Sequence, residues 1–238
     1  MAEANEVKIS LLTPTFRMSY PNLLTARQYV RNGKPQGDPN FSVNMIFDAE
    51  SLKKFRMVDE NDKLVDVDIT QVCKDMAAKK WKGTELSELF PKKPNGTTDW
   101  PIKKGDNLIA LEAKKTKPKN LDFLAGMYQI PAKGSVKYPP QLRYRENGEV
   151  ITLDRDNEAH VKIIKKLFDG GSYASAEVSV LAQETPQGNF ITFYLNKVMF
   201  KKEGKRLGGQ SLMDRFDGID GGESDVDPTA GDEDFGDI

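Results

Sequence analysis

The feature that most constrains the fold is a pair of long β-like segments near the C-terminal end of the chain. From Tyr173 to Gln183, small apolar residues occupy every second position, and Tyr, Ser and Glu occupy the positions between them. Residues 190–200 return with a similar strand-like composition, and residues 184–189 contain the Pro and Gly that are typical of a turn. The sequence therefore predicts a long β-hairpin over residues 173–200.

Other segments predict further strands and three helices. Strands are expected at 7–20 with a break near Pro14, at 41–47 and at 107–115, with short extended pieces at 128–130 and 141–145. Apolar residues at helical spacing predict a helix through Ile69 to Ala77. Asp48 and Asp156 are expected to cap two more helices, over 49–58 and up to Phe168, and turn residues predict a loop at 31–40.

The order of these segments indicates the fold class. Strands do not alternate regularly with helices, so a doubly wound parallel sheet is disfavoured. About five substantial strands with helices inserted between them fit a mainly β protein with α insertions, built as a small and strongly curved β-barrel.

The residues needed for common enzyme chemistry are missing. The chain has one histidine, His160, and one cysteine, Cys73, which are too few for a histidine or thiolate metal site. Cys73 lies on the apolar stripe of its helix and is expected to be a buried structural thiol. No nucleotide-binding or nucleophile motif is present. We therefore expect no enzyme, no cofactor and no metal, although Asp66 and Asp68 leave a metal-dependent nuclease as an alternative.

Charge is distributed very unevenly along the chain. Residues 214–238 contain ten carboxylates and one arginine, which gives −9, while the whole chain carries −1, so residues 1–213 carry +8. We expect two parts, a folded domain over 1–213 and a flexible, disordered acidic tail over 214–238. A flexible polyanion can occupy the same basic surface as a nucleic acid.

Residues 103–145 combine positive charge with aromatic rings. This segment has ten basic residues against three acidic ones, which gives +7. A basic groove with exposed rings suits single-stranded nucleic acid, because cations follow the phosphates while unpaired bases stack on the rings. The predicted DNA-binding residues are Lys103, Lys104, Lys114, Lys115, Lys117, Lys119, Phe123, Tyr128, Lys133, Lys137, Tyr138, Arg143, Tyr144 and Arg145. Phe16, Arg17 and Tyr20 are the alternative groove, and a second basic patch contains Lys197, Lys201, Lys202, Lys205 and Arg206.

Several segments resemble the bacteriophage single-stranded-DNA-binding proteins of the T7-type family. They are FRMSYPNL at 16–23, WPIKKGD at 100–106, GSYASAEVSV at 171–180, FYLNKVMFKKEGKRLGG at 193–209 and the acidic terminus DEDFGDI. The resemblance implies an OB-fold that coats single strands during phage DNA replication, recombination and repair. It also implies a tail that competes with DNA and contacts the replicative polymerase and helicase–primase, here through Asp232, Glu233, Asp234, Phe235 and Asp237.

Other interpretations remain open at this stage. A protein-interaction or recombination-mediator module would use the basic surface for an acidic partner, and Gln210 to Phe216 loosely matches a sliding-clamp peptide. Duplex DNA could also bind weakly, because single and double strands both present phosphates and phosphate contacts alone do not distinguish them. Pairing at a strand edge, or exchange of tails, would give a homodimer. The absence of a long apolar run and of a secretory signal predicts no membrane association and a place in the cytoplasm, that of the bacterial host if a phage encodes the chain.

Overall fold

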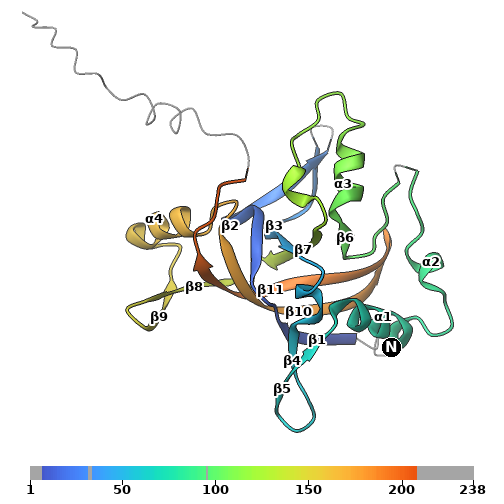
Figure 1. Ribbon diagram of the computed structural model, residues 1–238, viewed down its shortest axis with the longest axis horizontal. Coiled ribbons are helices and arrows are strands. Elements are labelled where there is room, and N and C mark those ends of the chain that lie inside the picture. The colour runs from blue at the N-terminus through green and yellow to red at the C-terminus, as the bar shows by residue number, and fades with distance from the viewer. Residues whose placement is uncertain (1–6, 32–33, 95, 208–238) are drawn as a thin grey trace, which may run out of the picture. The chain divides into compact units, whose positions relative to one another are not determined.

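The computed structural model describes residues 7–31, 34–94 and 96–207, which form a mainly β structure with several helices (Figure 1). The strands in this part of the chain are β1 (Val7–Leu12), β2 (Phe16–Arg31), β3 (Lys34–Phe47), β4 (Phe55–Val58), β5 (Leu64–Val67), β6 (Lys103–Lys104), β7 (Tyr128–Ser135), β8 (Gln141–Glu146), β9 (Glu149–Leu153), β10 (Tyr173–Thr185) and β11 (Gly188–Lys202). The helical segments are η1 (Ser51–Lys53), α1 (Ile69–Lys80), α2 (Leu86–Leu89), α3 (Gly105–Glu112), η2 (Asp122–Leu124) and α4 (Glu158–Leu167).

Five of the strands close a ring. β10 pairs with β11 over its whole length, and its first residues pair with Phe16 and Arg17 at the start of β2. β2 pairs antiparallel with β3, and β3 pairs antiparallel with β7. β7 then pairs in parallel with β11 and completes the ring. This closed set of strands is a five-stranded barrel, and the predicted mainly β fold with α insertions is confirmed.

The barrel interior is filled by the apolar side of each strand. Phe16 and Phe47 meet at 5.7 Å between ring centroids, and Phe47 meets Phe55 at 5.2 Å. Val178 and Phe193, from the predicted hairpin, are fully buried. The alternation seen in residues 173–200 therefore exists because one side of this hairpin forms the barrel wall and faces the core.

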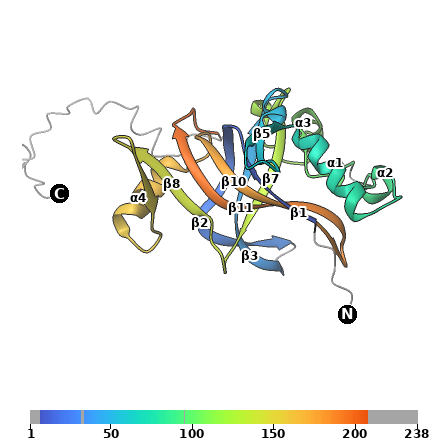
Figure 2. The same ribbon diagram turned by 90° about the horizontal axis from the view of Figure 1, so that it is seen from below.

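Helices and additional strands surround the ring. α1 packs against β1 and β10, and it lies on the opposite side of the barrel from α4 in both views (Figure 1, Figure 2). The Asp68 side chain accepts the backbone N–H of Thr70 at 2.7 Å and of Gln71 at 3.3 Å, so it caps α1. Cys73 is buried on this helix, as predicted, and burial raises the pKa of its thiol to about 12.

The predicted strand at 107–115 is wrong, because residues 105–112 form helix α3. In the helix Leu108, Leu111 and Glu112 share one side, which lines a cleft. A short run of apolar residues fits both the two-residue repeat of a strand and the 3.6-residue repeat of a helix. Here the tertiary contacts of the first turn favour the helix. The Gly105 N–H donates to the Met127 carbonyl at 2.7 Å, so the helix begins against the chain that leads into β7.

The predicted helix at 49–58 is also wrong. Asp48 does accept the backbone N–H of Ser51 at 2.7 Å, and this hydrogen bond lowers the pKa of its carboxyl. The helical turn ends at Lys53, however, and Phe55 to Val58 pair with β5 as a strand. Residues 55–58 form a strand in place of a helix because the strand buries Phe55 completely against the barrel core.

Three turn regions differ from the prediction. Residues 31–40 were expected to be a loop, but β2 extends to Arg31 and β3 begins at Lys34. Asn157, not Asp156, caps α4, accepting the N–H groups of Ala159 and His160. The sequence prediction missed β9, which follows β8 through Asn147 and Gly148, both at positive φ as a tight hairpin turn requires.

Candidate nucleic-acid interface

The outer surface of β3 and β7 is polar, in contrast to its inner surface. Val43, Met45 and Ala132 point inward and are buried. The alternate positions carry Ser42 and Asn44 on β3 and Gln129, Lys133 and Ser135 on β7, and the register sets Ser42 opposite Lys133. These five residues define the β3–β7 face. Strand alternation brings them onto one surface although the two strands are far apart in sequence.

A cleft of about 670 Å³ lies at one end of this face, and we name it the α3 cleft. Asn44 and Gln129 form its border with the β3–β7 face, and Leu108 and Leu111 of α3 form its apolar wall. Cations are supplied by the segment that follows α3, through Lys114, Lys115 and Lys119.

One tyrosine of the α3 cleft combines exposure with a neighbouring cation. The Tyr20 side chain is 54% exposed, and the Lys119 Nζ lies 5.6 Å from its ring centroid. Lys115 pairs with Glu112, and this hydrogen bond lowers the pKa of the Glu112 carboxyl. The ion pair ties the lysine segment to the end of α3, beside an exposed ring on which a base can stack.

A second cleft, of about 810 Å³, lies at the other end of the β3–β7 face. We name it the Tyr194 cleft, and Asn40, Lys133, Ser135 and Lys137 line it together with Tyr194. The Lys133 Nζ lies 5.2 Å from the Tyr194 ring centroid. This cleft therefore repeats the combination of lysine and aromatic ring found in the α3 cleft.

The two clefts belong to one continuous surface. Gln129 borders the α3 cleft, and Ser135 borders the Tyr194 cleft. These two residues are six positions apart on an extended strand, about 20 Å at the usual rise per residue. On β11 the polar surface continues through Thr192 and Tyr194, since Gln183 of β10 donates to the hydroxyls of both, at 2.9 and 3.4 Å. An extended chain with alternating charge and flat rings would fit along this surface.

Many of the predicted DNA-binding residues are brought together here. Lys114, Lys115 and Lys119 line the α3 cleft, and Lys133 and Lys137 line the Tyr194 cleft. Tyr138 is 71% exposed beside Lys137, whose Nζ lies 5.3 Å from its ring centroid. The remaining predicted residues of this region are Lys104 on β6, Lys117 after α3 and Phe123 on η2, of which Lys104 and Lys117 are exposed and Phe123 is half-buried.

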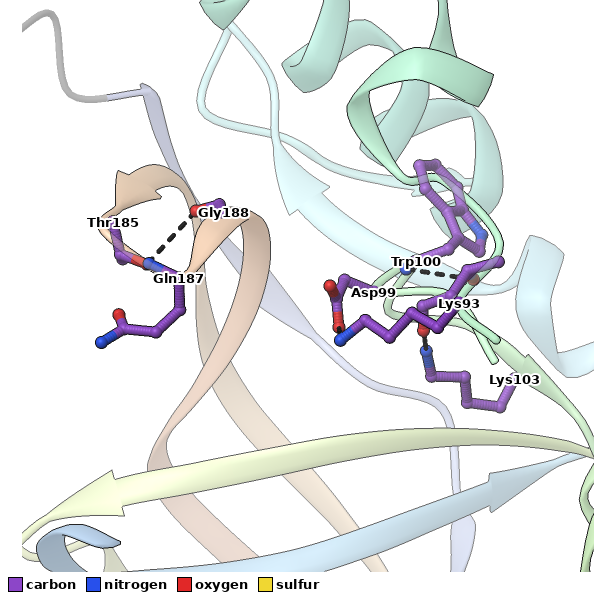
Figure 3. Close-up of polar contacts among 8 residues, drawn as sticks. Lys93, Asp99, Trp100, Lys103, Thr185, Gln187 and Gly188 are labelled. Carbon is purple, nitrogen blue, oxygen red and sulfur yellow. Dashed lines mark hydrogen bonds and ion pairs between the residues drawn. The ribbon is translucent and has the colours of Figure 1, made fainter. Parts of the chain in front are cut away.

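Lys103 has a different environment. Its ammonium donates to the Thr98 carbonyl, within a loop where Lys93 pairs with Asp99 at 2.7 Å (Figure 3). Burial lowers the pKa of Lys103. Lys103 supports the 93–103 loop, and its role in binding DNA stays a prediction.

Figure 3 also shows the β10–β11 turn, where the Gln187 N–H donates to the Thr185 hydroxyl.

Four other predicted residues lie outside the two clefts. Tyr128 and Tyr144 pack against the core, and the Tyr144 hydroxyl donates to Glu146 at 3.1 Å. Arg145 donates to the Gly148 carbonyl at 2.7 Å. Arg143 lines a separate cleft beside β8 and β11. The predicted tail residues Asp232, Glu233, Asp234, Phe235 and Asp237 lie outside the described residues, as does the clamp-like segment at 210–216.

Sequence reasoning missed Tyr194, Asn40, Asn44 and Gln129. Tyr194 lies on the polar side of a strand whose alternation was visible, but its nearness to Lys133 depends on the β7–β11 register. In the alternative groove, Phe16 is buried and Arg17 donates to the carbonyls of Gly171 and Lys205. Only Tyr20 of that group borders the α3 cleft.

The acidic pair considered for a nuclease has other partners. Arg56 donates to Asp66 at 3.1 Å, and Asp68 caps α1. Among the described residues, no group of three or more His, Cys, Asp and Glu could hold a metal ion. In the same part of the chain, no helix is both long and apolar enough to cross a membrane.

A closed five-stranded barrel with cations and exposed tyrosines along one face is typical of OB-type nucleic-acid-binding proteins. A family model, described as the ssDNA-binding protein of Enterobacter phage Enc34, matches residues 9–227. The chain belongs to this family. Membership confirms the resemblance to phage single-stranded-DNA-binding proteins and the expectation of a binding protein, not an enzyme.

Solved structures of the Enc34 protein are also similar to this chain. Its complex with ssDNA is 19% identical, with a TM-score of 0.52, and the match covers 87% of this chain and 96% of that one. A C-terminal truncation of the same phage protein is 18% identical, with a TM-score of 0.52, covering 87% and 95%. At this identity the likeness supports the fold. A comparison with curated proteins found no match.

Proposed function

We propose that this chain binds single-stranded DNA with little sequence preference along the β3–β7 face. In this proposal the lysines of the α3 cleft and the Tyr194 cleft neutralise phosphates, while Tyr20, Tyr138 and Tyr194 stack with bases. The chain would act in phage DNA replication and recombination, in the cytoplasm of the host. Membership of the Enc34 ssDNA-binding family supports this assignment.

The observation that carries the proposal is the repeated pairing of a lysine with an exposed or half-exposed tyrosine. Lys119 with Tyr20 and Lys133 with Tyr194 occur at the two ends of one polar strand pair. A lysine above a ring supplies charge for the phosphate next to a stacking surface for the base. Every base has a π-face, so such a surface tolerates any sequence.

We further propose that residues 214–238 compete with DNA for these lysines and recruit replication proteins. The support is the charge of the sequence, −9 on this segment against +8 on residues 1–213. Phe235, with the nearby Asp232, Glu233, Asp234 and Asp237, would give the replicative polymerase and helicase–primase an apolar anchor inside a charged rim. Division into domains at 213/214 belongs to the same proposal, and so does a homodimer formed by exchange of tails.

The decisive experiment measures binding of oligo(dT) by quenching of intrinsic fluorescence at several salt concentrations. Tyr20→Ala and Tyr194→Ala should each weaken binding by about 1–3 kcal/mol, because one stacked base is lost, and should leave the salt dependence unchanged. Tyr20→Phe and Tyr194→Phe are the matched controls. They keep the ring and should bind like the wild type.

Lysine substitutions test the charge contribution separately. Lys115→Gln and Lys133→Gln should each reduce the slope of log K against log salt by about 0.7, since one fewer counterion is released. Lys63→Gln, in the exposed β4–β5 turn, removes the same charge away from the face and should leave the slope unchanged. If the alanine variants bind as tightly as the phenylalanine variants, bases do not stack on this face and the proposal fails.

A further inference from the structure

A third cleft, of about 510 Å³, lies where β4, β8, β10 and β11 meet the corner between β1 and β2. We name it the Arg143 cleft. Leu12, Pro14 and Met199 give it apolar walls. Its charged lining consists of Lys54, Arg56, Arg143, Lys197, Lys201 and Glu177.

The cations of this cleft come from separate parts of the chain. Lys197 and Lys201 belong to the basic patch at the end of β11, while Lys54 precedes β4 and Arg143 lies on β8. Five cations against one carboxylate leave a lining charge of +4. Collecting like charges in one concave surface is unfavourable unless an anion neutralises them. The fold therefore creates an anion-attracting site that no single segment of the sequence reveals.

Only some of these cations are neutralised within the protein. Lys197 pairs with Glu177 at 2.7 Å, and Arg56 pairs with Asp66 at 3.1 Å. Lys54 and Lys201 are exposed, and no ion pair within 4 Å joins either of them to another described residue. Lys54 does attract the Asp48 carboxylate and helps to lower its pKa. Both ammonium groups remain accessible to an anion from outside.

Arg143 adds an unused hydrogen-bond donor. Its Nη2 donates to the Gln141 side chain at 2.7 Å. Its Nε is buried and has no acceptor among the described residues. A covered donor without an acceptor is unfavourable, so an anionic oxygen that reached this Nε would gain a hydrogen bond that the described residues leave unmade.

The lining favours phosphates over bases. None of the described residues that line this cleft is aromatic, so a base would find no ring on which to stack. Apolar side chains such as Leu12, Pro14 and Met199 suit the flat side of a deoxyribose, and the surrounding ammonium and guanidinium groups suit phosphodiester oxygens. The cleft is therefore chemically different from the α3 cleft and the Tyr194 cleft.

Strand β11 connects this cleft to the Tyr194 cleft. Tyr194 pairs with Lys133 of β7, and three residues later Lys197 pairs with Gln141 of β8. Three residues of strand span about 10 Å. β11 continues to Lys202, beyond Met199, which is the last of its residues that pairs with β8. A DNA strand that leaves the β3–β7 face at Tyr194 would meet Lys197 and then this cleft.

We propose that the Arg143 cleft holds phosphates of the same DNA strand after it leaves the β3–β7 face. The inference rests on the proposed function and extends it, since it assigns a longer footprint that continues along β11. The first part of the footprint uses both rings and cations, and the second part uses cations alone.

The test compares oligo(dT) of about 6 nucleotides with oligo(dT) of about 16 nucleotides, the upper end of the range for OB-type sites. The variant is Lys54→Gln/Lys201→Gln, because both side chains are exposed and their replacement leaves the core intact. The control is Lys63→Gln/Lys82→Gln, which removes the same charge at two exposed positions outside the cleft. Arg143→Gln serves as a second, independent variant.

For the long oligonucleotide, the cleft variant should bind about tenfold more weakly, with a salt slope smaller by about 1.4, and the control should be unchanged. The short oligonucleotide should bind both variants and the wild type equally. Equal affinity of the cleft variant and the control for the long oligonucleotide would overturn the proposal.

Two other outcomes are distinct from these. A synthetic peptide with the sequence of residues 214–238 that binds the wild type but not the cleft variant, with oligonucleotide affinity unchanged, would assign the cleft to an acidic peptide and overturn the proposal. Failure of the wild type to bind either oligonucleotide would reject the proposed function itself, and the longer footprint with it.

Discussion

At Gly105 the first turn of α3 passes so close to η2 that no side chain fits between them. A Cβ at this position would lie 1.9 Å from the Leu124 carbonyl oxygen and 2.8 Å from its carbon. Both are backbone atoms, so they cannot move aside as the end of a side chain can. This contact fixes α3 against η2 and thereby holds the lysine segment that follows α3 beside the β3–β7 face.

Gly105→Ala should therefore destabilise the protein. We expect the free energy of unfolding to fall by about 1–3 kcal/mol, the usual cost of forcing extra atoms into a packed site. Gly170→Ala is the control, because a Cβ there would meet its nearest atom at 3.7 Å, an ordinary contact, and should cost less than about 1 kcal/mol. Urea unfolding measures both, and equal stabilities of the two variants would contradict this account of the α3–η2 contact.

At the scale of a single element, α1 depends on the capping residue that precedes it as well as on its apolar stripe. Ile69, Cys73, Met76 and Ala77 are buried at helical spacing, so the sequence pattern was sufficient to predict the helix. The carboxylate of Asp68 satisfies two N–H groups that the helix itself leaves without acceptors. This assigns Asp68 a structural role, in place of the metal ligand that the nuclease alternative required.

Asp68→Ala should lower the free energy of unfolding by about 1 kcal/mol, the typical cost of removing an N-cap. Asp66→Ala is a close control two residues away. It breaks only an exposed ion pair with Arg56 and should cost about 0.5 kcal/mol or less. Thermal unfolding followed by circular dichroism distinguishes the two. A larger loss for Asp66→Ala than for Asp68→Ala would show that the cap is not what stabilises α1.

Elements without a strong pattern depended on tertiary contacts. Residues 107–115 fit a strand or a helix equally well, and the contacts of Gly105 selected the helix. Phe55 was expected on a helix, but pairing with β5 buries it against Phe47. β9 was missed although Asn147-Gly148 is the strongest short hairpin signal a sequence can carry, so this error was avoidable.

At the scale of the whole molecule, the uneven charge of the chain predicts electrostatic competition. Removing residues 214–238 should tighten binding of oligo(dT) several-fold at low salt, because nine net negative charges no longer compete for the lysines. The difference should shrink as salt is raised, since exposed charges are screened. Titrations of the full-length and truncated proteins across a salt series measure both effects.

Two variants separate the contribution of the tail's negative charge from that of its Phe235 side chain. Changing the tail carboxylates to amides keeps its length and should tighten binding as much as the truncation does. Phe235→Ala keeps the charge and should leave DNA binding unchanged while weakening capture of the replicative polymerase. If the truncated protein binds oligo(dT) no better than the full-length chain at low salt, the tail does not compete with DNA.

The sequence by itself determined the mainly β class, the long hairpin at 173–200, helix α1 and the uneven distribution of charge. These properties depend on local periodicity and on the positions of charged residues. Both can be read directly from the order of residues, without knowledge of any long-range contact. It also identified Lys114, Lys115, Lys119, Lys133 and Lys137 as candidates, because they lie in one dense basic segment.

Only the tertiary structure decided which of these residues face a common surface. The nearness of Tyr194 to Lys133 depends on the parallel register of β7 and β11, and the Arg143 cleft gathers cations from segments as distant as Lys54 and Lys201. By contrast, Tyr144 packs against the core, and Lys103 donates to a loop carbonyl. Strand register and barrel closure are set by long-range pairing, which no local pattern in the sequence specifies.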